Sequence, residues 1–192
     1  MRRGRWRIAM VAGEASGDLL GGALVKALKR GCRPRSFFGI GGPRMQAAGS
    51  NPGIRRRRWR CAAMSRSCGS CPSILRIRSE LRRRLLADPP DLFIGVDAPD
   101  FNLGLEEALK ARGITTVHYV SPSLWAWRGE RIHQMKRAAA KVLCLFPFEP
   151  EIYAKAGIPA SLRGPSAGGH AARRAGSRGR ARAVPSARRA AA

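Results

Sequence analysis

Short apolar runs alternate along the chain with longer segments whose apolar residues recur at helical spacing. Apolar runs bounded by Gly, Pro or polar residues predict strands over Arg7–Ala12, Ser36–Ile40, Leu92–Val96, Thr115–Val120 and Lys141–Phe146. Apolar positions three and four residues apart predict helices over Leu19–Arg30, Arg44–Ala48, Ile74–Ala87 and Leu103–Arg112. Either Ser16 or Asp18 is expected to cap the first of these helices.

The predicted strands are apolar throughout and do not alternate in polarity, which is typical of a parallel sheet covered by helices on both faces. The expected fold class is therefore α/β, with a Rossmann-like parallel sheet. Ligands of such sheets bind beyond the carboxyl ends of the strands. Three loops rich in polar residues or glycine follow strands here, and we expect them to converge on one site: Gly13–Asp18, Gly41–Arg44 and Asp97–Asn102.

The first of these loops offers backbone N–H groups at the start of a helix, which suits an anion. The spacing of Gly13 and Gly17 matches neither a P-loop nor a dinucleotide fingerprint, and Glu14 would repel a phosphate placed too close. Taken alone, the loop is more often a plain strand-to-helix turn.

Asp97 follows directly on a buried strand, where a charged side chain needs a reason, and a carboxylate fixed there could serve as a general base. Asp100 is better explained as the cap of a helix that starts near Phe101. His118 lies inside a strand, so we interpret it as a hydrogen-bonded core residue and not as a catalyst.

The loop after the fourth strand contains two tryptophans, Trp125 and Trp127, one residue apart. They could stack on a sugar or line an acyl groove, although packing beneath the loop is the default for such rings. Arg128 and Arg131 could hold a phosphate.

Composition adds a strongly basic balance, with a net charge of +25 over 192 residues. Six arginines lie in Asn51–Cys71 and eight in Leu162–Ala192, with no acid or lysine in either segment; subtracting these fourteen leaves +11 on the rest. At face value this charge indicates binding to nucleic acid or to an anionic membrane, and both remain alternatives. No specific nucleic-acid module is recognisable.

The cysteines Cys32, Cys61, Cys68, Cys71 and Cys144 lack the second ligand pair of a zinc site, so no metal and no cofactor is expected. There is no secretory signal and no apolar run long enough to span a bilayer. We therefore expect a cytoplasmic protein whose contact with a membrane is peripheral.

Several blocks resemble the lipid-A-disaccharide synthase family, in order and at the expected spacing. They are VAGEASGDLLG (Val11–Gly21), GIGGPRMQAAG (Gly39–Gly49), IGVDAPDFN (Ile94–Asn102), HYVSPSLWAWR (His118–Arg128) and LFPFEPEIYAKAGIP (Leu145–Pro159). The resemblance implies an inverting, two-domain GT-B glycosyltransferase of the inner membrane's cytoplasmic side. Its substrates would be UDP-2,3-diacylglucosamine and 2,3-diacylglucosamine 1-phosphate. It implies that Asp97 is the catalytic base and that Glu14, Ser16 and Asn102 line the same cleft, with Trp125 and Arg128 as further substrate-binding candidates.

The chain also departs from the family. We expect an acceptor-side domain over 1–160, an aberrant basic stretch at 51–73, a disordered basic tail over 161–192, and no carboxyl-terminal UDP-sugar domain, which would leave this chain inactive by itself. Codons for Trp59–Ser67 read two bases over, and codons for Ser161–Gly169 read one base over, can encode family-like sequence. We therefore hypothesise two shifts of reading frame.

Overall fold

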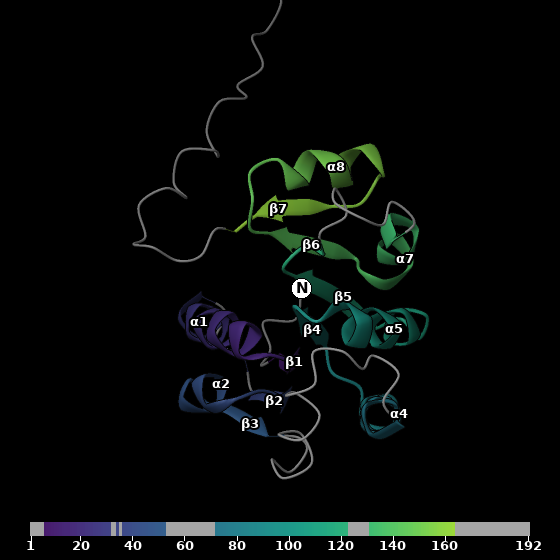
Figure 1. Cartoon of the computed structure of the whole chain (residues 1–192). Coiled ribbons are helices and arrows are strands. Elements are labelled where there is room, and N and C mark those ends of the chain that lie inside the picture. The colour runs from purple at the N-terminus through teal and green to yellow at the C-terminus, as the bar shows by residue number, and fades with distance from the viewer. Residues whose placement is uncertain (1–5, 32–33, 35, 53–71, 123–130, 164–192) are drawn as a thin grey trace, which may run out of the picture.

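The computed structural model describes residues 6–31, 34, 36–52, 72–122 and 131–163. Within these ranges the strands form a single sheet in the order β3-β2-β1-β4-β5-β6-β7, and every neighbouring pair is parallel (Figure 1). The strands are β1 (Arg7–Ala12), β2 (Ser36–Ile40), β3 (Ser50–Pro52), β4 (Leu92–Val96), β5 (Thr115–Tyr119), β6 (Lys141–Cys144) and β7 (Ala160–Leu162). This arrangement confirms the predicted α/β class with a parallel sheet.

Helices cover both faces of the sheet, as Figure 1 shows. They are α1 (Ala15–Gly31), α2 (Pro43–Ala47), α4 (Pro72–Ala87), α5 (Pro99–Lys110), α7 (Arg131–Ala138) and α8 (Glu149–Lys155). α1 and α2 lie on one face, α4, α5 and α7 lie on the other, and α8 packs beside β7 at the edge. None of the helices described is long and apolar enough to cross a membrane.

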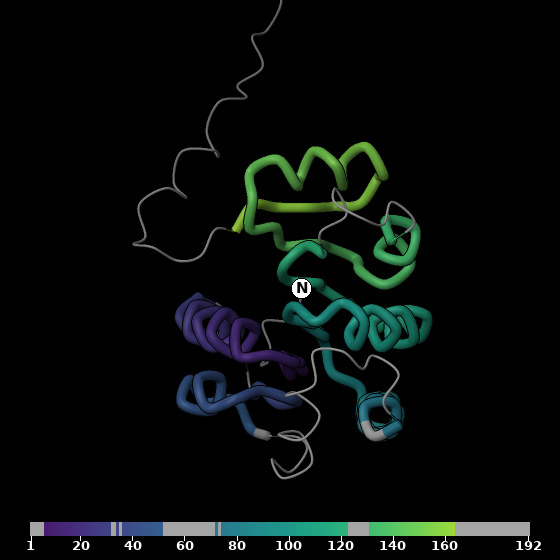
Figure 2. Tube along the Cα trace, viewed as in Figure 1, coloured from purple at the N-terminus to yellow at the C-terminus, as the bar shows by residue number. Residues whose placement is uncertain are grey.

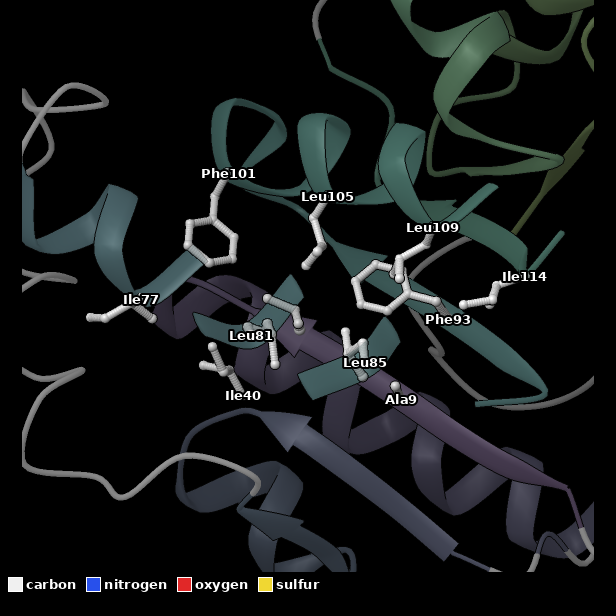
Figure 3. Close-up of a cluster of buried hydrophobic side chains, with 11 residues drawn as sticks. Ala9, Ile40, Ile77, Leu81, Leu85, Phe93, Phe101, Leu105, Leu109 and Ile114 are labelled. Carbon is white, nitrogen blue, oxygen red and sulfur yellow. The ribbon is translucent and has the colours of Figure 1, made fainter. Parts of the chain in front are cut away.

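The central strand β1 shows why both faces must be covered. Ile8 and Met10 face the helices α1 and α2, whereas Ala9 and Val11 face α4 and α5, and all four are buried. Figure 3 shows the second of these layers, in which side chains from α4 and α5 converge on Phe93 of β4. A strand buried on both faces reads as a continuous apolar run, which is the pattern seen in the sequence.

The order in which strands are added to the sheet changes direction between β1 and β4. The early strands run outward from β1 to β3, and the later strands run outward from β4 to β7 on the other side (Figure 2). Such a topological switch point leaves a crevice at the carboxyl ends of the two central strands. The loops that follow β1 and β4 are therefore the ones best placed to form a site.

The predicted strands β1, β2 and β4 have the expected bounds, and β5 and β6 end one and two residues earlier than expected. Most helices begin earlier than predicted, because their first turns carry Pro, Gly or Ser, which periodicity does not count as helical. Four short elements, β3, α7, α8 and β7, were not predicted from the sequence. α7 and α8 have eight and seven residues, and β3 and β7 have three each, too few for a recognisable pattern.

The capping predictions for the first helix are wrong. α1 starts at Ala15, so Ser16 and Asp18 already lie within its first turn. Asp18 instead accepts hydrogen bonds from the backbone N–H groups of Arg44 (2.9 Å) and Met45 (3.0 Å), and so caps α2 from another element. Asp100 is not the cap of α5 either, because that helix begins at Pro99 and its cap residue is Ala98.

The expected domain limits stay predictions. β7 lies at the expected end of the folded domain, and α4 begins at Pro72, inside the stretch expected to be aberrant. Residues 53–71 and 164–192 lie outside the described residues, as do Cys32, Cys61, Cys68 and Cys71.

Candidate active site

Asp97 is the first residue after β4 and lies at the switch point of the sheet. Its backbone N–H donates to the carbonyl oxygen of Tyr119 on the neighbouring strand (2.8 Å). One carboxylate oxygen, Oδ1, accepts a hydrogen bond from the N–H of Ala98 (2.9 Å), and the other, Oδ2, accepts one from the hydroxyl of Ser16 (3.1 Å). The half-buried carboxylate is thus held in one orientation by groups from two loops.

Gly17 allows the first turn of α1 to approach the end of β4 closely. A Cβ atom at this position would lie 3.2 Å from the carbonyl oxygen of Val96 and 3.6 Å from the Cβ of Asp97. The approach places the amino-terminal end of α1 beside the carboxylate of Asp97. That end of a helix carries a partial positive charge, which attracts a negatively charged group.

The backbone that carries Asp97 is strained. Asp97 (φ 57°) and Ala98 (φ 43°) are consecutive non-glycine residues in the left-handed region. Each such residue costs about 1–2 kcal/mol. The carbonyl oxygen of Ala98 accepts backbone hydrogen bonds from Phe101 and Asn102, both at 3.0 Å, which ties the turn to the start of α5.

Asn102 also supports this turn through its side chain, which is fully buried. Its Nδ2 atom donates to the carbonyl oxygen of Asp97 (2.7 Å), with a longer contact to that of Val96 (3.4 Å). The resemblance to the family implied that Asn102 lines the cleft, whereas in the structure its side chain is buried beneath the turn.

The other predicted site residues are placed as follows. Ser16 and Glu14 are exposed, and Ser16 contacts the carboxylate of Asp97 directly. Trp125 and Arg128 lie outside the described residues. Arg131, the first residue of α7, forms an ion pair with the exposed carboxylate of Asp100.

The remaining predicted loop, Gly41–Arg44, also reaches this edge of the sheet. Asp18 of α1 fits against Gly42, where a Cβ atom would lie 2.4 Å from Oδ2 of Asp18. Together with the contact between Ser16 and Asp97, this shows that the three loops gather at the carboxyl ends of β1, β2 and β4, as the sequence predicted.

Two buried polar residues, Glu106 and His118, lie below the turn, and the sequence did not predict that they form a pair. Nδ1 of His118 lies 2.9 Å from Oε1 of Glu106, and both side chains are inaccessible to solvent. This contact confirms His118 as a hydrogen-bonded core residue. Glu106 follows Asn102 by four residues on α5, a spacing that places both on one face of the helix. This spacing is the signal in the sequence that could have connected Asn102 with Glu106.

The arrangement provides an oriented carboxylate at an accessible edge, with a serine hydroxyl and a helix end beside it. An ionised carboxylate offers about four lone-pair positions, so Asp97 retains the capacity to accept a proton or a further hydrogen bond. Among the residues described, no three His, Cys, Asp or Glu side chains gather closely enough to hold a metal ion.

Known proteins resemble this chain over most of its length. A family model for lipid-A-disaccharide synthetase matches residues 8–164. The chain is 53% identical over 163 residues to the lipid-A-disaccharide synthase of Chromobacterium violaceum and 52% identical over 159 residues to that of Burkholderia thailandensis. A solved structure of a glycosyltransferase from Rickettsia africae aligns with a TM-score of 0.49 at 16% identity, over 82% of this chain and 42% of that one.

The two alignments to the synthases cover 85% and 82% of this chain but 42% and 41% of the relatives. The chain therefore spans about two fifths of the length of the curated relatives that it matches. The matched region runs from β1 to β7 and includes every described residue of the candidate site. On this match, the chain belongs to the lipid-A-disaccharide synthetase family.

Proposed function

We propose that this chain forms the acceptor-side half of an inverting glycosyltransferase that makes the lipid A disaccharide. The enzyme would transfer 2,3-diacylglucosamine from UDP to 2,3-diacylglucosamine 1-phosphate. The observation that carries the proposal is the carboxylate of Asp97, oriented by Ser16 and the N–H of Ala98 at the switch point of the sheet. Family membership supplies the class of reaction.

In this proposal Asp97 accepts the proton of the acceptor hydroxyl as that oxygen attacks the anomeric carbon of the UDP-sugar. The new glycosidic bond forms on the face opposite to the departing UDP, so one general base suffices on this side of the reaction. The two hydrogen bonds to the carboxylate hold it in position for this step.

The departing UDP needs positive charge or hydrogen-bond donors of its own, because negative charge develops on its phosphate in the transition state. None of the described groups that contact Asp97 is a cation. We assign the binding of the nucleotide to the part of the relatives that this chain does not cover. The chain by itself is therefore expected to be inactive.

We further propose peripheral association with the cytoplasmic face of the inner membrane, where both acylated substrates reside. α4 supports this proposal because it presents Arg76 and Arg82 to solvent, and exposed arginines attract anionic lipid headgroups.

The proposal is tested with two proteins. One is the chain itself; the other is a completed enzyme that keeps residues 6–52 and 72–159 of this chain and takes all other segments from the Chromobacterium violaceum synthase. Each is incubated with both lipid substrates, and formation of disaccharide and UDP is followed, with either substrate omitted as a control.

We expect the completed enzyme to form both products only when both substrates are present, and the chain alone to form neither. A folded completed enzyme that releases no disaccharide under these conditions contradicts the proposed function.

A further inference from the structure

The buried side chain of Asn102 has no access to substrate, yet it donates to the residue proposed as the base. We infer that Asn102 is a positioning residue, which fixes the left-handed turn of Asp97 and Ala98 so that the carboxylate of Asp97 faces Ser16. This inference rests on the proposed function and gives Asn102 a different role from the cleft-lining one expected from the sequence.

The first step is geometric. The only side-chain hydrogen bond described for the carbonyl of Asp97 comes from Nδ2 of Asn102 (2.7 Å). The orientation of this carbonyl depends on ψ of Asp97 and φ of Ala98, because it lies in the peptide plane between them. The hydrogen bond therefore constrains both strained residues of the turn. Without it, only the backbone hydrogen bonds of the turn would oppose relaxation of Asp97 and Ala98 toward the ordinary backbone regions. The carboxylate would then swing away from Ser16.

The second step concerns what holds Asn102. Gly95 of β4 lies against it: a Cβ atom there would lie 3.0 Å from the Cβ of Asn102 and 2.0 Å from Oε1 of Glu106. Gly95 is also paired in register with His118 on β5. The missing side chain at Gly95 thus makes room for a buried layer of Asn102, Glu106 and His118, which confines the amide of Asn102 below the turn.

The third step is energetic. Among the residues described, Oδ1 of Asn102, Oε2 of Glu106 and Nε2 of His118 are buried without a hydrogen-bond partner. Buried polar groups that lack partners destabilise a fold, and apolar side chains of similar size would pack there more favourably. Sites where a sequence departs from the most stable choice are typically functional ones, which agrees with a role in positioning Asp97.

The test uses the completed enzyme and measures kcat, the KM for the acceptor, and the melting temperature. Asn102→Ala should lower kcat by at least about tenfold, since small displacements of a catalytic group have large effects on rate. The KM should stay within about twofold of the parent value, because a buried side chain makes no contact with the substrate. Leu103→Val is the matched control: it is the buried neighbour on α5, and it should lower the melting temperature while leaving kcat unchanged.

A second variant separates positioning from stability. Ala98→Gly, added to Asn102→Ala, relieves the left-handed strain at Ala98 and should raise the melting temperature again. It does not restore the hydrogen bond to the carbonyl of Asp97, so kcat should remain low. If Asn102→Ala does not fold, Asn102→Ser replaces it in the same measurements of kcat and melting temperature.

Recovery of kcat in step with the melting temperature, or a parent-like kcat for Asn102→Ala, overturns the inference. These outcomes are distinct from failure of the proposed function. If the parent enzyme forms no disaccharide, the proposed function fails; if the parent is active and only Asn102 proves dispensable, the positioning role alone is lost.

Discussion

Asp97 and Asn102 are separated by five positions, and their side chains point to opposite sides of the same turn. Asp97 could be predicted because a carboxylate directly after a buried strand is unusual. The orientation of Asn102 could not, since it depends on α5 beginning at Pro99, directly after a left-handed alanine. Alanine gives no sequence signal for that conformation. The sequence therefore indicated a loop at Asn102 where the structure has the first turn of a helix.

Glu106 illustrates a second limit at this scale. A glutamate on an amphipathic helix is ordinarily solvated, and only the partner strand reveals that His118 lies within hydrogen-bond distance. The pairing joins residues on α5 and β5, so no spacing within either element encodes it.

Cys144 gives a prediction about a single residue. Burial raises the pKa of its thiol to about 12, and the nearby carboxylate of Glu149 contributes in the same direction. Since the thiolate is the reactive form, Cys144 should resist alkylation by iodoacetamide at pH 8 and react only in denaturant. Site-by-site mass spectrometry measures this. Rapid labelling of Cys144 in the folded protein contradicts the placement of β6.

The helices α1 and α2 show how elements depend on each other for their ends. The cap residue of α2, Gly42, has no side chain to offer, and Asp18 of α1 supplies the carboxylate in its place. Periodicity predicted both helices. It could not predict this cap, because the conventional rule searches for the capping residue just ahead of the helix itself.

The cap gives a prediction at the scale of the element. Asp18→Ala removes both acceptors from the N–H groups of Arg44 and Met45 and should lower the free energy of unfolding by about 1–2 kcal/mol. Lys26→Ala, an exposed change on the same helix, should alter it by less than about 0.5 kcal/mol. Urea unfolding of the two variants provides the comparison; equal midpoints contradict the role of Asp18.

For the whole molecule, the sequence predicted a parallel sheet, which is confirmed, and three loops that converge at its carboxyl edge, which the structure also shows. That these loops form an active site stays a prediction. The order of the strands was not predicted, since it depends on contacts between elements far apart in the chain. The peripheral elements were missed for a related reason. β3 and β7 have three residues each, and their pairing with β2 and β6 defines them more than their own composition does.

The basic segments lead to a prediction about the gene. We propose that the aberrant stretch within residues 51–73 and the chain from Ser161 onward are encoded out of frame relative to the family. Independent sequencing of the gene should then show a frame-restoring base change near each segment, and translation should yield family-like sequence such as Phe-Val-Gly-His-Pro-Leu after Ala160. An intact reading frame at both places refutes this explanation of the excess charge.

The most direct test of the account is the rate of the chemical step with and without the carboxylate of Asp97. In single-turnover experiments with the completed enzyme in excess, Asp97→Asn should slow disaccharide formation by about 10²–10⁴-fold, the usual contribution of a general base. Asp100→Asn, which changes the exposed carboxylate three residues further on, should leave the rate within about twofold. A parent-like rate for Asp97→Asn, or an equal loss for both variants, would show that the base lies elsewhere.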